Sequence, residues 1–297
     1  EHREALLKAI RSGCNLIDTS TNYMDGESEQ VVGAVLQQLI RAGEVAREEI
    51  IVVSKIGYVQ GQNLAQAKTR EKSGKPYPDM VKYGDDIWHC IHPEFLADQL
   101  TLSLDRLGLA TLDVCLLHNP EYFLSHATRL GAGEQRELST LRDEFYARLQ
   151  LAFEYCERQV EAGRLRGYGV SSNTSTASPD EPGATSVSRM IEAAKAAAKN
   201  VGAAAHHFTV LQCPMNVHES GAALIKNTGP DNGSTLLDEA LREGVAVLVN
   251  RPLNAMPAQR GGVVRLADVP VPAPEADFET QRQKVALLEE EYRKDLA

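Results

Sequence analysis

The sequence predicts an α/β barrel of parallel strands, because strand-like and helix-like segments alternate along most of the chain. Six of these segments are nearly continuous in apolar residues, as expected of strands covered on both faces. Six such units favour a barrel over an open doubly wound sheet, which remains the alternative on pattern alone. A length of 297 residues is ordinary for one barrel domain.

Each expected element follows from apolar periodicity and from end signals. Helix-like EHREALLKAIRSG ends at Gly13, and Pro93 opens another helix. A helix ending at Gly244 is capped by Thr235 or Ser234. We expect strands at 14–18, 49–55, 112–118, 165–172, 208–214 and 244–250. We expect helices at 1–13, 27–42, 93–108, 140–162, 185–199, 235–244 and 277–296.

Composition narrows the class of protein. The net charge of −10 and a pI of about 5.4 argue against a nucleic-acid partner held through its phosphates. No apolar run reaches 18 residues, so no membrane span is expected. The five cysteines form no C-x-x-C pair and are interpreted as core thiols in a reducing compartment. We expect a soluble protein of the cytoplasm or of an organellar matrix or stroma. The chain starts inside a helix-like pattern, so a targeting segment upstream of it remains open.

Chemically active side chains stand where three successive strands end. Asp18, Lys55 and His118 each close an apolar run, and Tyr23 follows Asp18 by five positions. In a parallel barrel the functional groups collect at this end of the strands. A polar residue where a strand reaches water is an ordinary explanation for any one of them. It explains less well why these four residue types occur together.

These four side chains have complementary chemistry. A phenol such as Tyr23 can donate a proton to a developing alkoxide if its own anion is stabilised. The ammonium of Lys55 would favour the phenolate, and Asp18 would hold that ammonium in place. The imidazole of His118 could orient a carbonyl oxygen toward the phenol. Such a set suits carbonyl reduction, provided that another group delivers a hydride.

The motifs resemble those of the aldo-keto reductase family, whose members fold as a (β/α)8 TIM barrel and use NADPH or NADH. The matching stretches are "LIDTS", "NYMDGESE", "VVSKIG" and "LLHNP". The resemblance extends over about residues 3–256. It implies that Asp18, Tyr23, Lys55 and His118 form the catalytic tetrad of the family.

The resemblance also implies a cofactor site, with NADP expected and NAD possible. In "GRLRGYGVSSN" and "VLQCPMN" it marks Ser171, Ser172, Asn173 and Gln212 as contacts of the nicotinamide amide. Met215 occupies the position of an aromatic residue that stacks on the nicotinamide. The stretch "GVAVLVNRPLNA" resembles the loop over the pyrophosphate, which implies roles for Asn250, Arg251, Pro252, Leu253 and Asn254.

Three features depart from the family pattern. Met215 offers a thioether in place of an aromatic ring. The usual Tyr-x-Pro-Leu is replaced by Asn250-Arg251-Pro252-Leu253. The first and eighth barrel strands would fall before residue 1 and after residue 297, so we expect them in a longer chain or in a partner chain. A short strand at 261–266, GGVVRL, would lie where the family has a loop.

A long polar insertion at 56–92 is expected near the active-site face, as a lid or a specificity loop. Its end, "DIWHCIHPE", brings His89, Cys90 and His92 together in the sequence. A metal site would need further ligands at usable spacing, so no metal is expected. Trp88 and His89 are instead expected to line the substrate pocket, with core packing an equal alternative for Trp88.

Residues 1–297 are therefore expected to form one aldo-keto-reductase-like domain, with a helix in a C-terminal extension at 257–297. The expected activity is NAD(P)H-dependent interconversion of an aldehyde or ketone and an alcohol, with the proton supplied by Tyr23. The alternative is a non-catalytic or weakly catalytic subunit of a larger protein assembly. The expected partners are a small carbonyl or alcohol substrate and, for the alternative, another protein. The sequence names neither the substrate, nor NADP over NAD, nor the oligomeric state.

Overall fold

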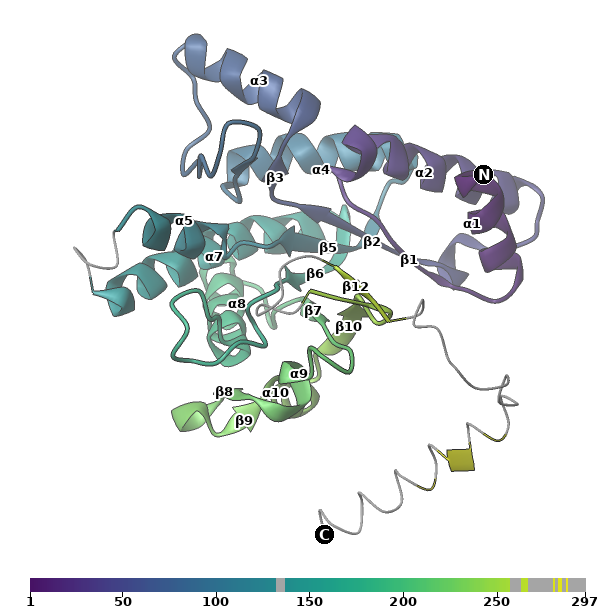
Figure 1. Cartoon of the computed structure of the whole chain (residues 1–297). Coiled ribbons are helices and arrows are strands. Elements are labelled where there is room, and N and C mark those ends of the chain that lie inside the picture. Colours follow the sequence, from purple (N-terminus) through teal and green to yellow (C-terminus); the bar gives the residue numbers. More distant parts are fainter. Residues whose placement is uncertain (132–136, 257–262, 267–279, 281–282, 285–286, 288–297) are drawn as a thin grey trace. The chain divides into compact units, whose positions relative to one another are not determined.

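Six parallel strands form one curved sheet in the order β1-β2-β5-β6-β7-β10 (Figure 1). Every neighbouring pair in this sheet is parallel. The strands are β1 (Leu16–Asp18), β2 (Ile51–Ile56), β5 (Leu112–His118), β6 (Leu165–Ser171), β7 (Phe208–Pro214) and β10 (Ala246–Asn250). The expected strands are therefore confirmed, although β1, β2 and β10 each begin two residues later than predicted.

The computed structural model describes residues 1–131, 137–256, 263–266, 280, 283–284 and 287. It divides into two compact units, Glu1–Pro252 and Leu253–Ala297. The six-stranded sheet belongs to the first unit. Within the described residues, no helix is long and apolar enough to cross a membrane.

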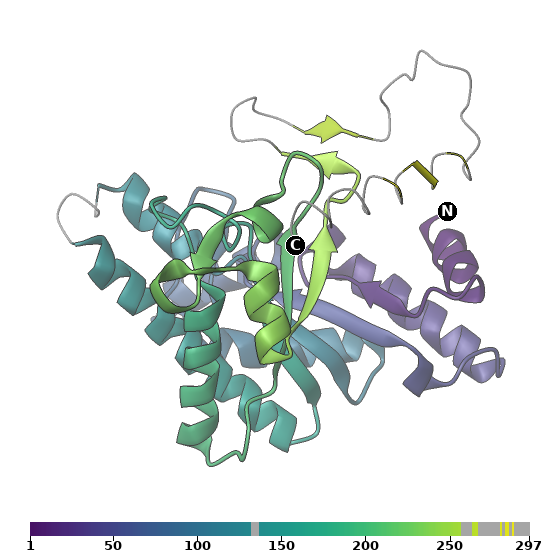
Figure 2. The ribbon, with the colours of Figure 1, turned by 90° about the horizontal axis from the view of Figure 1, so that it is seen from below.

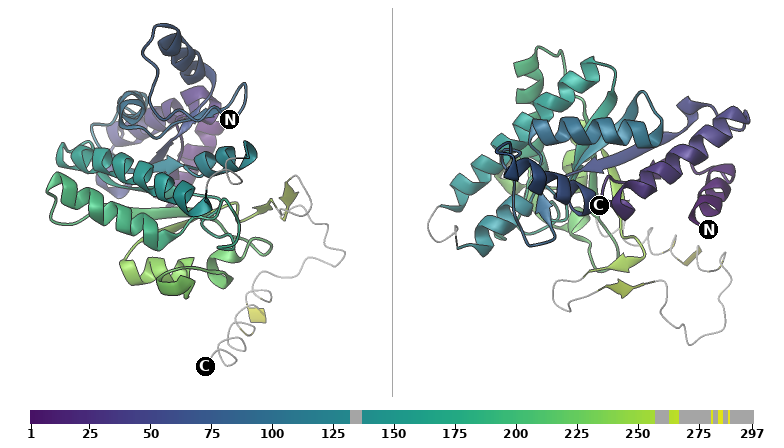
Figure 3. Two further views of the ribbon diagram at one scale, coloured as in Figure 1. Left: turned by 90° about the vertical axis from the view of Figure 1, so that its left-hand side faces the viewer. Right: turned by 90° about the horizontal axis from the view of Figure 1, so that it is seen from above.

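Helices connect the strands and form one layer outside the sheet, as Figures 2 and 3 show. Neighbouring helices contact each other in the order α1, α2, α4, α7, α8, α10. Over residues 1–131 and 137–252, the helices are α1 (His2–Arg11), α2 (Glu27–Arg41), α3 (Gly61–Lys72), α4 (Pro93–Leu107), α5 (Tyr122–Arg129), α7 (Leu138–Glu161), α8 (Val187–Val201), α9 (Gly221–Leu224) and α10 (Leu236–Glu243). Short 3-10 turns lie at Tyr23–Gly26, Arg47–Glu49 and Pro230–Asn232.

Local sequence signals explain where these helices begin and end. Pro93 occupies the first turn of α4, and the His92 side chain accepts a hydrogen bond from the backbone N–H of Glu94. Thr235 caps α10 in a capping box with Asp238. Both helices end at a glycine with positive φ, 64° at Gly108 and 68° at Gly244.

The two faces of the sheet have different roles. The outer face packs against the helices and forms the main hydrophobic core. The concave face carries a smaller apolar cluster of Val53, Val114, Leu116, Val210 and Leu248. Because side chains alternate along a strand, the residue two positions beyond each member lies on the same face. The concave face therefore continues toward the carboxyl ends of the strands with polar side chains. The curved sheet with helices outside it confirms the predicted barrel class.

The insertion at 56–92 contains regular structure that the sequence analysis treated as a loop. Strands β3 (Tyr58–Val59) and β4 (Trp88–His89) pair antiparallel, and α3 lies between them in the chain. A second small pair, β8 (Lys226–Thr228) and β9 (Ser234–Thr235), precedes α10. Short two-residue pairings carry little periodicity, which explains why the sequence pattern did not reveal them.

The second unit contains an antiparallel pair, β11 (Asn254–Ala255) with β12 (Val264–Arg265). The strand expected at 261–266 is therefore confirmed at Val264–Arg265. The helix expected at 277–296 falls mostly outside the described residues. The expected single domain over 1–297 stays a prediction.

Gly169 allows β6 to approach β7 where the register shifts between Tyr168 and Gly169. A Cβ at Gly169 would overlap the carbonyl oxygen of Val210 and lie 3.1 Å from Leu116 Cδ2. We expect Gly169→Ala to lower the free energy of unfolding by at least about 2 kcal/mol, since backbone must move to relieve the overlap. Chemical denaturation measures the change. Gly84→Ala is the control, because its Cβ would meet only Ile87 at 3.4 Å. Equal midpoints for the two variants would contradict the packing described here.

Candidate active site

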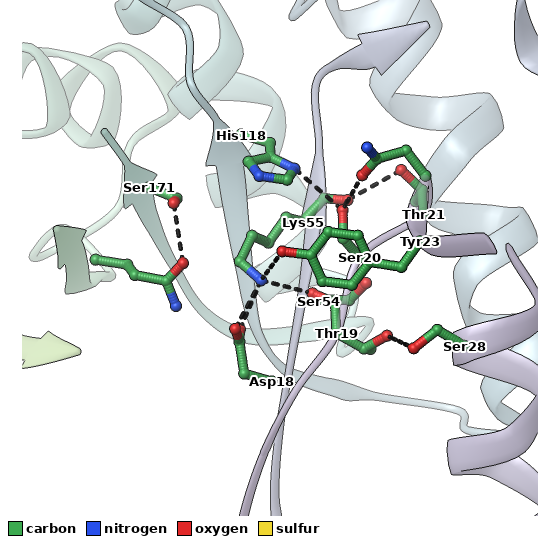
Figure 4. A network of polar contacts seen from close by, with 12 residues as sticks. Asp18, Thr19, Ser20, Thr21, Tyr23, Ser28, Ser54, Lys55, His118 and Ser171 are labelled. Carbon is green, nitrogen blue, oxygen red and sulfur yellow. Dashed lines mark hydrogen bonds and ion pairs between the residues drawn. The ribbon is translucent and has the colours of Figure 1, made fainter. Parts of the chain in front are cut away.

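The ends of β1 and β2 bring a carboxylate and an ammonium together, as the sequence predicted (Figure 4). Lys55 Nζ donates to the Asp18 carboxylate at 2.8 Å and to the carbonyl oxygen of Thr19 at 2.9 Å. The Lys55 side chain is fully buried, whereas the Asp18 side chain is 34% exposed. The ion pair therefore places a buried positive charge on the concave face, with its counter-charge toward solvent.

Tyr23 lies over this charge. Its hydroxyl is 3.5 Å from Lys55 Nζ, and Nζ is 5.0 Å from the centre of its ring. Tyr23 stands in the 3-10 turn after β1 and is 39% exposed. A phenol that is both next to an ammonium and open to solvent can reach a ligand on the concave face.

His118 closes β5 and lies edge-on to Tyr23, with ring centres 6.0 Å apart. Its Nδ1 is 3.1 Å from the Ser20 hydroxyl. Burial, followed by the charge of Lys55, lowers the pKa of His118 to about 2. The imidazole is therefore neutral at ordinary pH, and its action on a ligand is limited to hydrogen bonding. The structure thus brings together the four residues that the sequence singled out.

The ends of β6 and β7 add a second polar group. Ser171 Oγ donates to Gln212 Oε1 at 3.0 Å, and these two residues are register partners. Gln212 Nε2 has no hydrogen-bond partner among the described residues, so it remains available to a ligand. Ser172 is turned inward, where its hydroxyl accepts hydrogen bonds from the backbone of Thr174 and Ser175. Ser172 therefore shapes its own loop in this structure.

Asn173 and Arg251 meet from two different loops. Arg251 Nη1 donates to Asn173 Oδ1 at 3.2 Å, while Nη2 pairs with Glu219 at 2.7 Å. Asn250 ends β10 beside Pro214, and its carbonyl accepts from the Met215 N–H at 3.3 Å. Met215 is partly buried against the main core.

The remaining residues of the expected pyrophosphate loop fall on either side of the unit boundary. Pro252 is the last residue of the first unit, whereas Leu253 and Asn254 belong to the second. Leu253 is 60% exposed and Asn254 pairs with Arg265 across β11 and β12. The contacts of this loop with a cofactor stay a prediction.

Several residues around His118 were missed by the sequence analysis. The Tyr58 ring lies edge-on to His118 at 4.6 Å, and its hydroxyl accepts from Asn119 Nδ2 at 2.7 Å. The Tyr122 ring is also edge-on to Tyr58, at 5.2 Å. Both tyrosines follow a tetrad residue by a few positions, which was the one signal available in the sequence.

Glu121 was missed as well. It is fully buried, and one carboxylate oxygen accepts from the Asn173 N–H at 2.7 Å. Burial raises the pKa of Glu121 to about 7. This carboxyl group therefore ties the loop after β5 to the loop after β6.

The insertion reaches the site through His89. Its Nε2 donates to the carbonyl oxygen of His118 at 2.7 Å, and its ring stacks on Tyr122 at 5.5 Å. Trp88, the neighbouring residue, lies in the main core, with Lys82 Nζ 4.7 Å from its ring centre. This placement favours the packing role that the sequence left open for Trp88. Cys90 and His92 have separate partners, Pro78 O and Glu94 N, so the two histidines and the cysteine of "HCIH" do not converge.

Comparison with known proteins identifies the family. The model of the aldo/keto reductase family matches residues 1–181, more than half of the chain. The chain therefore belongs to the aldo/keto reductase family. A solved structure of a Bacillus halodurans aldo-keto reductase in its holo form superposes with a TM-score of 0.50 at 16% identity, covering 93% of this chain and 61% of that one. This likeness supports the barrel fold.

Two curated relatives show how far the similarity reaches. The chain is 32% identical to an NADH-specific methylglyoxal reductase of Escherichia coli over 116 residues, which are 39% of this chain and 30% of the relative. It is 31% identical to 2,5-diketo-D-gluconic acid reductase B of a Corynebacterium over 170 residues, 57% of this chain and 40% of the relative. The matched regions span less than half the length of these relatives.

The buried His89 predicts a pH dependence of stability. Burial lowers the pKa of His89 to about 4 from an ordinary value of 6.5. Below about pH 6.5 the imidazole binds a proton in the unfolded chain but not in the folded chain. The free energy of unfolding therefore decreases as the pH is lowered. His89→Gln keeps an N–H donor and removes the titration. We expect wild type to lose about 1.4 kcal/mol per pH unit relative to this variant as the pH falls toward about 4.

Urea unfolding at a series of pH values measures this difference. Comparing the two proteins cancels the opposite contribution of Glu121, whose raised pKa favours the folded state as the pH falls below about 7. Above pH 6.5 the difference between the two proteins should be constant. A difference that stays constant down to pH 4 would show that His89 is not held neutral.

Proposed function

We propose that this chain carries the catalytic site of an NAD(P)H-dependent oxidoreductase that interconverts an aldehyde or ketone and an alcohol. The observation that carries the proposal is the Tyr23 hydroxyl, 3.5 Å from a fully buried ammonium that Asp18 holds in place. The family membership of the chain supports the same reaction class.

In this proposal Tyr23 is the general acid. It donates its proton to the substrate oxygen as negative charge develops there, and Lys55 stabilises the phenolate that remains. Asp18 keeps the ammonium oriented through its contact at 2.8 Å. His118, which is neutral, holds the substrate beside the phenol without adding a second positive charge. In the oxidation direction the same groups act in reverse, and Tyr23 receives the proton of the alcohol.

The nicotinamide, when bound, supplies or accepts the hydride. The residues on β6 and β7 fit the carboxamide of such a ring, because Gln212 Nε2 has no partner within the described part of the chain and lies beside the Ser171 hydroxyl. Asn173 and Arg251 would bind further along the cofactor, together with Asn250. Relatives support either coenzyme: one is named NADH-specific, and an apple relative, 25% identical over 171 residues, is named an NADP-dependent D-sorbitol-6-phosphate dehydrogenase. We propose NADP, with NAD possible.

Replacing the phenol tests the proposal. We expect Tyr23→Phe to lower kcat for methylglyoxal at least about 100-fold, the typical share of a positioned general acid. The affinity for NADPH should change little, because Tyr23 donates only to the substrate. Loss of NADPH absorbance measures turnover, and calorimetric titration with NADPH measures binding. Tyr77→Phe is the matched control, since Tyr77 lies in the insertion and its hydroxyl donates to Asp98 of α4 at 2.5 Å.

The outcomes separate the two candidate functions. Unchanged turnover in Tyr23→Phe would remove Tyr23 from the reaction. A wild-type chain that binds NADPH or NADH but reduces neither methylglyoxal nor 4-nitrobenzaldehyde would favour the alternative, a non-catalytic subunit of an assembly. Met215 at the expected nicotinamide-stacking position is the observation that keeps this alternative open.

A further inference from the structure

The turn that carries Tyr23 has an unfavourable backbone conformation. Met24 and Asp25 have φ angles of 50° and 55°, in the left-handed region that residues other than glycine rarely adopt. Aspartate is among the residues that tolerate this region, whereas methionine has no such advantage. The Met24 side chain is 63% exposed, so little packing offsets the cost. Contacts outside the turn must therefore hold it.

The chain is fixed on both sides of this turn. Before it, the N–H and the hydroxyl of Thr21 donate to the carbonyl oxygen of Lys55 at 3.1 and 3.0 Å. After it, α2 begins at Glu27. Tyr23 lies between these two anchors, with its ring over the Lys55 ammonium (Figure 4). The position of the phenol therefore depends on the backbone of residues 22–25.

The first residues of α3, in the insertion, bind the turn at Asp25. The Gln62 N–H donates to both oxygens of the Asp25 carboxylate, at 3.2 Å each. Gln62 is the second residue of α3, and Gln60, the residue before the helix, makes no side-chain capping bond. The Asp25 carboxylate therefore takes the place of a capping side chain, and the dipole of α3 attracts its negative charge.

Two further features of the insertion fit this contact. Gly61 has a φ of +51°, and a Cβ there would lie 2.5 Å from Asp25 Oδ1, so the missing side chain lets the carboxylate approach the helix. On the other side of Tyr23, Asn22 Nδ2 donates to Gln60 Oε1 at 3.1 Å. The insertion thus binds the turn one residue before Tyr23 and two residues after it.

We propose that Asp25 is a positioning residue for Tyr23: its carboxylate binds the first turn of α3 and thereby keeps the phenol over Lys55. The inference rests on the proposed function and deepens it, because it gives the insertion a part in turnover itself. A loosened turn would move the phenol away from the reacting oxygen, and a displacement of about 1 Å can cost about 100-fold in rate. Binding of substrate and cofactor would change little, because the groups proposed to bind them are unaltered.

Two replacements of Asp25 test this role. Asp25 is exposed, so its replacement should leave the fold intact. We expect Asp25→Ala to lower kcat for methylglyoxal at least about 10-fold, with KM and the affinity for NADPH unchanged. Asp25→Asn keeps an oxygen that accepts from the Gln62 N–H, so it should restore most of the rate. Wild-type kcat in Asp25→Ala, or an effect on KM alone, would overturn the proposal.

Two glycines of the insertion provide a matched comparison. Gly61→Ala places a methyl group against the Asp25 carboxylate, whereas a Cβ at Gly74, just beyond the other end of α3, meets nothing within 4 Å. Both glycines have positive φ, 51° and 74°, so both alanine variants carry backbone strain. We expect kcat to fall in Gly61→Ala as in Asp25→Ala, and the two changes together to cost no more than either alone. Equal kcat in Gly61→Ala and Gly74→Ala would contradict the proposal.

The position of the phenol can also be followed without turnover. In protein labelled with ¹³C at tyrosine Cζ, the signal that is missing from Tyr23→Phe reports on the surroundings of that ring. We expect this signal to shift in Asp25→Ala and Gly61→Ala and to stay in place in Gly74→Ala. An unmoved signal in Asp25→Ala would overturn the proposal. A wild-type chain that reduces neither methylglyoxal nor 4-nitrobenzaldehyde overturns the proposed function instead, and the Tyr23 signal still decides whether Asp25 holds the ring.

Discussion

The buried ammonium of Lys55 is the constraint on which the rest of the site depends. An ion of this size costs several kcal/mol to remove from water unless partners replace its hydration. Asp18 and the Thr19 carbonyl supply those partners, and both come from the end of β1 and the residue that follows it. Strand β1 must therefore lie beside β2 in the observed register, with Asp18 opposite Val53. The need to pair Lys55 also fixes the point at which the chain leaves β1. From there it forms the turn at Tyr23–Gly26, which brings the Tyr23 ring over Lys55.

The parallel register then places the other polar groups near the carboxyl ends of neighbouring strands. Lys55 pairs with Leu116, and two residues further along β5 is His118, whose partner on β6 is Ser171 and whose next neighbour on β7 is Gln212. Lys55, His118 and Gln212 each follow an apolar residue of the concave face by two positions. Ser171 pairs with both His118 and Gln212. The concave face therefore changes from apolar to polar along a single line. This geometry brings the phenol of Tyr23, the ion pair and the polar ends of β5, β6 and β7 together from segments far apart in the sequence.

The sequence could predict this arrangement only in part. Strands 112–118 and 208–214 were predicted with the observed bounds, because a strand covered on both faces is a continuous apolar run that polar residues end sharply. Asp18, Lys55 and His118 were predictable for the same reason, since they end such runs, and Tyr23 was found from its short spacing after Asp18. The place of Ser20 beside the site was not, because it arises from a contact with His118 across 98 positions. In the sequence it is one small polar residue among several in a loop.

The insertion shows how such long-range contacts link a variable segment to the site. Gly57 follows β2, and a Cβ there would lie 2.5 Å from the His118 carbonyl oxygen and 2.7 Å from His89 Nε2. The absence of a side chain thus lets His89 donate to the backbone of His118. The insertion therefore contacts the backbone of His118 through His89, and the Ser20 hydroxyl contacts its imidazole ring. Backbone and ring of one histidine are held by two separate segments, so its orientation does not depend on a bound ligand.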